Sequence, residues 1–397
     1  MSEPAKRHPL PLQGLRIVEL ANVVAGPSVG KYLSDFGAEV IKVERPGQGD
    51  STRDMGQMIG SRSAWWVVLG RNKRSVTLDL KGQADRETFL RLCATADAVV
   101  ESQRPGVLES LGLGPQVLLE QKPDLIVARI SGFGQTGPYA RRPGFGTLAE
   151  AFSGLASING EEDGPPMLAP TAIADEVAGL FATWALMVAL YARDVSGVPG
   201  QVIDVSLFEA LMSTLGPLPT LFRQHGYLQG RHGSRLPWSA PRNVYRSRDG
   251  HYFALSGTAP VPAAAILRLV GGDQLAADPR FATSQARGEN ADELDKLVAA
   301  WIATLDADEL DERFARDGIA AIRVMDLQQV LEHPHTIERG TMVEVEDDEV
   351  GKVAMQGPVP RFSVTPGRIR HSGPALGADN HSVLRELGLL KEEDLSS

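Results

Sequence analysis

The sequence predicts an α/β protein with a doubly wound parallel sheet and a smaller second domain. Over the first 130 residues, short apolar segments rich in Val and Ile alternate with amphipathic segments of helical length. This alternation is typical of βαβ units that build a parallel sheet. After about residue 225 the pattern changes to hairpin signals and helices, which favours a separate, smaller α+β domain. A length of 397 residues allows two or three domains.

Five strand segments are expected in the N-terminal part, and helical segments separate several of them. The expected strands are residues 15–21, 39–44, 75–80, 97–102 and 124–131, with helices over 28–37, 85–96 and 108–120. Functional groups of such a sheet lie at the carboxyl ends of the strands. We therefore expect the site in the loops that follow these strands.

The second half begins with a Gly- and Pro-rich loop over residues 153–170. The longest apolar run follows at residues 177–192, which is short for a membrane span and suits a helix buried in a large core. A strand over 201–207, a hairpin at Asp249-Gly250, a second hairpin over 341–357 and a terminal helix from residue 381 are expected beyond it.

Composition argues against several classes of protein. Lys and Arg total 40 against 50 for Asp and Glu, and the net charge of −10 disfavours a nucleic-acid binder. The single cysteine, Cys93, excludes an internal disulfide and a cysteine-rich metal site. The polar, Pro-rich start lacks the apolar core of a signal peptide. We expect a soluble, cytoplasmic protein that binds neither membrane nor nucleic acid.

Two short segments match known active-site motifs, but the residues around them do not fit those motifs. Residues 132–137 match GxGxxG after a strand, but Pro138 and Pro143 follow where a dinucleotide site needs a helix. Residues 26–30 match GxSxG, so Ser28 could be a hydrolase nucleophile, but the spacing singles out no partner histidine. The alternative is a tight turn whose glycines allow a helix to pack on the sheet.

No metal site is expected from local spacing. His333-Pro334-His335 is the only close histidine pair, and the proline between the histidines indicates a solvated loop.

Asp175 stands at the head of the most apolar helix. A helix N-terminus favours negative charge, so this carboxylate should stay ionised even when partly buried. Such a group is a candidate nucleophile. An ordinary N-cap is the alternative, because Asp is common at that position.

Basic residues gather near the ends of the βα segments despite the acidic total. They are Arg45, Arg53, Arg71, Lys73, Arg74 and Arg104, with Arg141 and Arg142 after the fifth strand. If several converge on one rim of the sheet, the rim suits a polyanionic ligand such as a nucleotide with phosphates. Singly, each could be an ordinary surface charge.

Long segments of the chain resemble one family over essentially its whole length. They are LQGLRIVELANVVAGPSVGKYLSDFGAEVIKVERPGQGD, GRNKRSVTLDLK, VVESQRPGVLESLGLG, ISGFGQTGPYARRPGFGTLAEAFSGL, the helix after Asp175 through GVPGQVIDVSLFEAL, and the tail from RGTMVEVE to LGADNHSVLRELGL. The chain resembles the class III CoA-transferases, which include formyl-CoA and carnitine CoA-transferases and α-methylacyl-CoA racemase.

The resemblance implies a large Rossmann-like domain built from N- and C-terminal segments, a smaller inserted domain, and an interlocked-ring homodimer. The corresponding boundaries are 1–215 and 330–397 for the large domain and 225–325 for the small one. It also implies that Asp175 is the nucleophile, which forms an aspartyl anhydride and then an aspartyl thioester with CoA, without a metal.

The resemblance carries CoA contacts onto matching positions. The turn of Asn22, Val23, Val24 and Ala25 would line the pantetheine path. The nucleotide and its phosphates would lie near Arg45, Arg71, Lys73, Arg74 and Arg104.

One departure from the racemase pattern favours the transferase branch. Gly144-Phe145-Gly146 stands where racemases have Gly-His-Asp, so the histidine that would exchange a proton is missing. The surrounding stretch resembles transferases of C4–C5 dicarboxylic acids such as succinyl, mesaconyl, malyl or citramalyl groups, with transfer between two acids or within one. Phe145, Glu150 and Gly257 are expected at the acyl site. The alternatives are an acyl-CoA racemase, a serine hydrolase using Ser28, and a non-catalytic CoA-binding homologue.

Overall fold

The computed structural model describes residues 8–389, and these form two compact units. The first unit contains residues 8–155, 169–216 and 337–389, and the second contains 156–168 and 217–336. The sequence boundaries kept 156–168 with the large domain. The structure assigns this stretch to the second unit, where the N–H of Gly233 donates to the Gly160 carbonyl at 2.9 Å.

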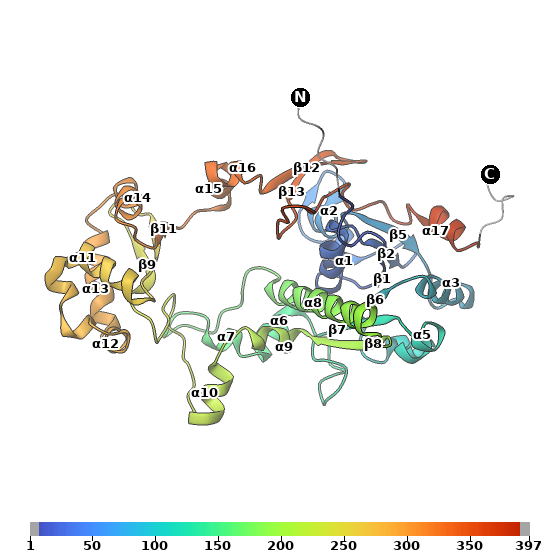
Figure 1. The fold of residues 1–397 in the computed structure, drawn as a ribbon, viewed down its shortest axis with the longest axis horizontal. Helices are drawn as coiled ribbons and strands as arrows, with labels where there is room; N and C mark the ends of the chain where they lie inside the picture. Colours follow the sequence, from blue (N-terminus) through green and yellow to red (C-terminus); the bar gives the residue numbers. More distant parts are fainter. Residues whose placement is uncertain (1–7, 390–397) are drawn as a thin grey trace. The chain divides into compact units, whose positions relative to one another are not determined.

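A six-stranded, fully parallel sheet forms the centre of the first unit (Figure 1). Its order is β5 (Lys73–Thr77), β2 (Glu39–Glu44), β1 (Arg16–Leu20), β6 (Ala98–Glu101), β7 (Ile126–Ser131) and β8 (Gln201–Ser206). The predicted parallel sheet is therefore confirmed. The chain winds outward from β1 in one direction and from β6 in the other, so the crevice between β1 and β6 is the switch point where such sheets bind ligands.

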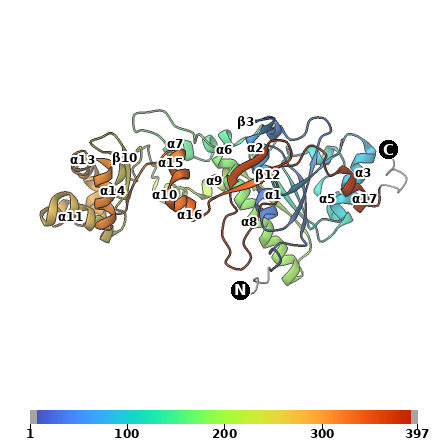
Figure 2. The same ribbon diagram turned by 90° about the horizontal axis from the view of Figure 1, so that it is seen from above.

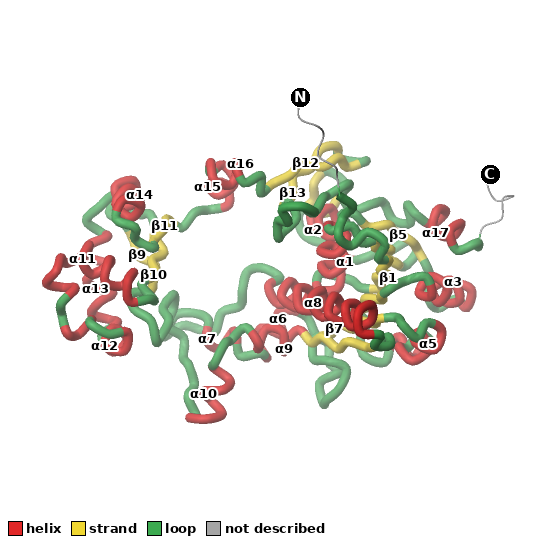
Figure 3. The backbone as a smooth tube through the Cα atoms, viewed as in Figure 1, coloured by secondary structure: helices red, strands yellow, loops and turns green. Residues whose placement is uncertain are grey.

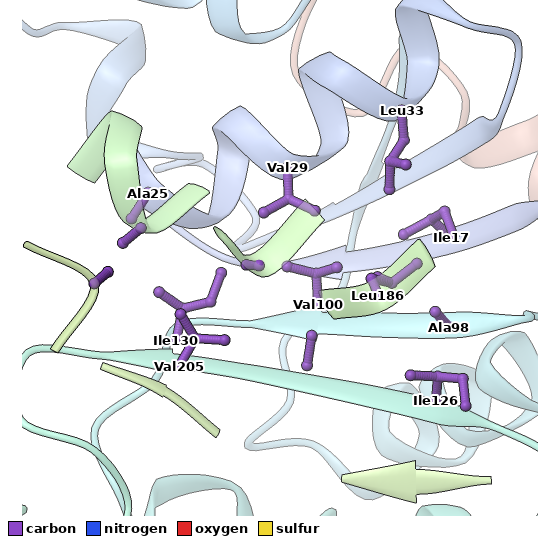
Figure 4. Close-up of a cluster of buried hydrophobic side chains, with 14 of the residues drawn as sticks. Ile17, Ala25, Val29, Leu33, Ala98, Val100, Ile126, Ile130, Leu186 and Val205 are labelled. Atoms are coloured by element: carbon purple, nitrogen blue, oxygen red, sulfur yellow. The ribbon is translucent and has the colours of Figure 1, made fainter. Parts of the chain in front are cut away.

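Helices cover both faces of this sheet because its strands are apolar on both sides. Ile17 packs into a cluster with α1 (Ala25–Asp35) and α8 (Ile173–Ser196), part of which Figure 4 shows. The next residue, Val18, points into a second cluster with α3 (Gln83–Ala94), α5 (Pro115–Gln121) and α17 (Asn380–Glu386). This change of face between adjacent residues follows from the two-residue period of a strand.

Helix α8 is longer than predicted and only one side of it is buried. It contacts α1, β7 and β8, while large apolar side chains remain exposed on its other side. The expectation of a helix buried in a large core therefore holds for one side of α8 only. Within the described residues, α8 is the one helix long and apolar enough to cross a membrane by length and composition.

The C-terminal segment packs on the first unit. The hairpin of β12 (Met342–Asp347) and β13 (Gly351–Gln356) forms an apolar cluster with α2 (Ala64–Leu69). Helix α17 lies against β5, although some 300 residues separate them in the sequence (Figures 1 and 2). The second predicted hairpin is confirmed, and the expected terminal helix ends at Glu386, with its predicted continuation over 390–395 outside the described residues.

The second unit is α+β (Figure 3). Its antiparallel sheet contains β9 (Arg242–Arg246), β10 (Tyr252–Ser256) and β11 (Ala321–Arg323), and the predicted hairpin at Asp249-Gly250 joins β9 to β10. The helices that share its core are α11 (Pro260–Ala276), α13 (Ala291–Ile302) and α14 (Ala307–Arg316).

The remaining elements are short. They are β3 (Met58–Ile59), β4 (Arg62–Ser63), α4 (Val107–Ser110), α6 (Gly146–Phe152), α7 (Leu155–Ile158), α9 (Leu207–Ser213), α10 (Leu218–His225), α12 (Ser284–Glu289), α15 (Leu327–Glu332), α16 (Pro334–Glu338) and the 3-10 turns Ser51–Arg53 and Pro279–Phe281.

Candidate active site

A cleft follows the carboxyl edge of the parallel sheet in the first unit. One cavity of about 240 Å³ lies where β1, β6 and β7 end, and Asp175 is among its lining residues. A second cavity, of about 480 Å³, lies over the loops that follow β2 and β5. Asn22 and Gln103 line both cavities, so the two form one continuous cleft that starts at the switch point.

Asp175 is the third residue of α8 and does not cap the helix. The N-cap is Ala172, which makes no side-chain capping bond, so the N-cap alternative for Asp175 is wrong. Burial raises the pKa of Asp175 to about 6, and the charges of Glu176 and Glu150 act in the same direction. The backbone N–H groups of Asp175 and Ala25 act in the opposite direction and lower the pKa. At neutral pH the group is therefore mostly ionised, and it is a stronger nucleophile than a solvated aspartate.

Gly146 allows the backbone of α6 to approach Asp175 closely. A Cβ atom at this position would lie 2.3 Å from Asp175 Oδ2, well inside van der Waals contact. Glycine is therefore required here by space rather than by backbone conformation.

The turn between β1 and α1 has an unusual backbone. Val23 adopts φ 68°, a left-handed conformation that is rare for a β-branched residue and costs about 1–3 kcal/mol. Two backbone donors of the turn have side-chain acceptors: Asn22 N–H donates to Ser102 Oγ at 3.0 Å, and Val23 N–H donates to Asp50 Oδ1 at 3.2 Å. The turn places Asn22, Val23 and Ala25 at the wall of the cavity that contains Asp175.

Four buried charges lie behind this turn. Lys42 Nζ lies 2.9 Å from Glu19 Oε1 and 2.7 Å from Asp50 Oδ2, and Lys73 Nζ lies 2.8 Å from Glu19 Oε2. All four side chains are fully buried. Burial opposes the charge of Lys42, but the nearby carboxylates outweigh it and raise its pKa. Sequence reasoning missed this cluster, although charged residues inside the apolar strands β1 and β2 were a signal for it.

Two of the five basic residues expected near the nucleotide and its phosphates lie in the cleft. Arg104 lines the cavity of Asp175, and Arg45 lines the larger one. Arg71, Lys73 and Arg74 line neither cavity.

The positions of these three residues do not support a role at the CoA phosphates. Arg71 Nε donates to Asp35 Oδ1 at 3.0 Å and Lys73 is paired with Glu19. Arg74 pairs with Glu39 and Glu386 at the amino end of the sheet. All three side chains are therefore already paired with carboxylates of the first unit.

The acyl-site residues have different surroundings. Phe145 is exposed and lines the cavity of Asp175. Glu150 is buried, and its Oε2 accepts from Ala169 N–H at 2.7 Å, so it acts on Asp175 through charge alone. Gly257 belongs to the second unit, where it packs against Pro241 and Ile266.

Some cleft residues were not predicted. They are Ser102, Gln103 and Ser131 beside Asp175, and Gln48 and Lys81 in the larger cavity. Their common signal is position, because each lies at or just after the carboxyl end of a parallel strand. Arg142, which the sequence placed in the basic rim, also lines the cavity of Asp175, and its guanidinium lies 3.7 Å from the ring centroid of Tyr139.

The two rejected motifs have structural roles. Ser28 lies inside α1 with its side chain fully buried, and no described histidine lines either cavity, which argues against a serine hydrolase. In the GxGxxG segment, Gly132 crosses the backbone of Gly144 so closely that a Cβ would lie 2.5 Å from its Cα. Among residues 8–389 there is no group of three or more His, Cys, Asp or Glu side chains placed to hold a metal ion.

A doubly wound parallel sheet with a cavity at its switch point is the arrangement in which α/β proteins bind their ligands. The family model described as CoA-transferase family III matches residues 12–380, and the chain belongs to this family. It is therefore a CoA-transferase.

Curated relatives and a solved structure agree with this assignment. The succinyl-CoA–D-citramalate CoA-transferase of Chloroflexus aurantiacus is 41% identical over 99% of this chain and 98% of its own length. The succinyl-CoA–L-malate CoA-transferase alpha subunit of the same organism is 33% identical, over 100% and 93% respectively. The crystal structure of a CAIB/BAIF family protein from Brucella suis has a TM-score of 0.82 and 33% identity, and covers 96% of this chain and 100% of that one.

Proposed function

We propose that this enzyme transfers CoA from an acyl-CoA to a carboxylic acid with Asp175 as the covalent nucleophile. The observation that carries the proposal is the half-buried Asp175 carboxylate, with a pKa near 6, in the cleft at the switch point of the sheet. A carboxylate can attack a thioester because a thiolate is a good leaving group, and burial strengthens the attack.

Transfer then takes four balanced steps. The Asp175 carboxylate attacks the thioester carbonyl, CoA leaves as a thiolate, and a mixed anhydride forms. The thiolate attacks the Asp175 carbonyl of this anhydride, which releases the first acid as a carboxylate and leaves an aspartyl-CoA thioester. The second acid displaces the thiolate to form a new anhydride. The thiolate then attacks the acyl carbonyl, which restores Asp175 and gives the new acyl-CoA, with no net change in protons or electrons.

The shape of the cleft suits a long, anionic cofactor. Pantetheine would run past the Asn22 turn, with its thiol end toward Asp175. The nucleotide would occupy the larger cavity, where Arg45 and Lys81 are exposed and, among residues 8–389, form no ion pair. Arg104 lines the cavity of Asp175 and follows Gln103, which lines both cavities, so its guanidinium is available to a phosphate.

We propose a C4–C5 dicarboxylic acid as the acyl partner. Two similar enzymes are named for succinyl-CoA with citramalate or malate. Arg142 lines the cavity of Asp175 and, among residues 8–389, has no carboxylate partner, so it can bind the second carboxylate of such an acid.

The decisive experiment is to trap the covalent intermediate. The enzyme is incubated with succinyl-CoA, quenched and digested, and the peptide that carries residue 175 is analysed by mass spectrometry. We expect a CoA adduct on this peptide in the wild type and none in Asp175→Ala. CoA transfer by a well-folded Asp175→Ala variant would contradict the mechanism, and a panel of mono- and dicarboxylic acids identifies the acceptor.

We also propose that the enzyme acts as a homodimer, as the family resemblance implies. One face of α8 exposes large apolar side chains, namely Leu180, Trp184, Val188, Tyr191 and Val195. A neighbouring hollow of about 520 Å³ is lined by Leu180, Trp184, Met187 and Phe362. Solvent exposure of such a stripe is unfavourable, and a second copy of the chain would remove it from water.

The oligomeric state can be tested at one valine. Val188→Glu places a charge on the apolar face of α8 and should shift the mass measured by light scattering from dimer to monomer. Val261→Glu makes the same change at a residue that is 80% exposed in the second unit and serves as the matched control. A wild type that is monomeric at micromolar concentration would reject the dimer.

A further inference from the structure

Asp50 connects the cluster of buried charges to the active-site turn. Its two carboxylate oxygens have different partners: Oδ2 lies 2.7 Å from Lys42 Nζ, and Oδ1 accepts from Val23 N–H at 3.2 Å. Oδ1 also accepts from the backbone and side chain of Thr52, each at 2.9 Å. Asp50 is therefore fixed on several sides and has little freedom to move away from Val23.

Lys42 fixes the other end of the same turn. Its ammonium donates to the carbonyl of Ala21 at 2.7 Å, in addition to its ion pairs with Glu19 and Asp50. The residue before Val23 and the residue after it are held as well, by Ser102 and by the start of α1. The left-handed Val23 is thus enclosed between fixed points, which is the condition under which a strained residue persists.

The conformation of Val23 determines the position of Ala25, two residues later, which lies beside the nucleophile. Ala25 begins α1 and lines the same cavity as Asp175. Its backbone N–H also lowers the pKa of the Asp175 carboxyl group. If Val23 relaxed to an ordinary negative φ, the chain between β1 and α1 would change course and Ala25 would leave its place at the cavity wall.

We propose that Asp50 is a positioning residue for CoA transfer, which holds Val23 in its left-handed conformation so that the turn keeps Ala25 in place at the wall of the Asp175 cavity. This inference rests on the proposed role of Asp175 as nucleophile. Asp50 touches no substrate itself, since it is fully buried and lines neither cavity.

Asp50→Ala and Asp50→Asn separate positioning from charge balance. The amide oxygen of Asn can still accept from Val23 N–H, whereas both variants lose the negative charge. We expect kcat to fall at least tenfold in Asp50→Ala with little change in KM for succinyl-CoA, and Asp50→Asn to recover most of the loss. Equal losses in the two variants would assign Asp50 to charge balance and overturn the proposal. Thr52→Val removes a different donor to the same oxygen and serves as the control.

A glycine at position 23 gives the sharper test. Glycine adopts a left-handed φ without strain, so it should make Asp50 less necessary. We expect Asp50→Ala to cost at least tenfold in kcat in the wild-type background but less than threefold when compared with Val23→Gly alone. The same cost in both backgrounds would show that Asp50 does not act through Val23.

A third variant covers the case in which Asp50→Ala does not fold. Val23→Pro keeps all four buried charges, removes the N–H donor and excludes a positive φ. We expect a kcat at least tenfold below wild type with an unchanged unfolding transition, and wild-type kcat would reject the proposal. The adduct experiment tests the proposed roles of Asp175 and Asp50 separately. No adduct in the wild type refutes the role of Asp175, while an adduct that forms equally fast in Asp50→Ala refutes only the role of Asp50.

Discussion

At the scale of single residues, the nucleophile depends on a glycine as much as on its own charge. Gly146 leaves only 2.3 Å between its missing Cβ and Asp175 Oδ2. Gly146→Ala should displace the carboxylate from its present position and lower kcat about 10- to 100-fold, because small displacements of reacting groups are costly.

The stability of the Gly146→Ala variant should change little, because alanine is a good helix former at the start of α6. Gly288→Ala is the matched control: it also replaces a helical glycine, and the nearest atom to its new Cβ is 3.5 Å away. Steady-state kinetics of both variants test whether glycine is required at position 146. Equal kcat values for Gly146→Ala and Gly288→Ala would contradict this requirement.

The pH dependence of the reaction reports on Asp175 directly. Burial raises the pKa of this group to about 6, and only the ionised form can attack a thioester. Activity should therefore be full above this pH and should fall as pH decreases through about 6. The acid limb of the pH profile of kcat/KM measures this fall in activity. A midpoint near 4 would indicate that Asp175 titrates like a solvated aspartate.

At the scale of elements, the pairing of α1 with α8 sets the charge around the nucleophile. Glu176, next to Asp175, raises the pKa of its neighbour, and Lys31 of α1 lies 3.3 Å from Glu176 Oε1. Tyr32 also donates to Glu176. The long contact between these two helices therefore places a compensating cation beside the site.

Lys31→Met removes this compensation. The unbalanced charge of Glu176 should move the acid limb upward by about 0.5–1 pH unit, because a nearby like charge disfavours ionisation of Asp175. Adding Glu176→Gln in the same chain removes the repelling charge and should bring the limb back to or below its original position. The pH profiles of kcat/KM for the single and double variants provide the measurement. An acid limb at the wild-type position in Lys31→Met would show that solvent already screens the charge of Glu176.

The same scale shows what the sequence could predict. The strands of the parallel sheet were predictable because β-branched residues cluster in short runs, and β2 was predicted to the residue. Asp175 was predictable from its place at the start of a helix, whereas the Asn22 turn was expected only from the family resemblance. The partners of Arg71 and Arg74 were not, because Asp35 and Glu386 come from distant parts of the chain. Local position cannot distinguish a surface arginine from one that is already paired within the fold.

At the scale of the whole molecule, Asn72 joins three distant parts of the first unit. Its side chain donates to Asp35 Oδ1 at 3.1 Å and to the Arg368 carbonyl at 2.9 Å, and accepts from Arg370 N–H at 2.7 Å. Its backbone adopts φ 62° and donates to the carbonyl of His371 at 3.1 Å. The returning C-terminal segment is thus fixed to β5 and α1 through one buried residue.

Asn72→Ala should therefore destabilise the first unit by about 2–4 kcal/mol, through lost hydrogen bonds and a left-handed backbone that alanine tolerates poorly. Asn72→Gly loses the same hydrogen bonds but accepts the backbone conformation, so it should be about 1 kcal/mol more stable than Asn72→Ala. Denaturant unfolding measures both values, with Asn290→Ala in the second unit as the control. A loss below about 0.5 kcal/mol for Asn72→Ala would mean that the C-terminal segment is held without Asn72, through contacts such as the β12–β13 hairpin on α2.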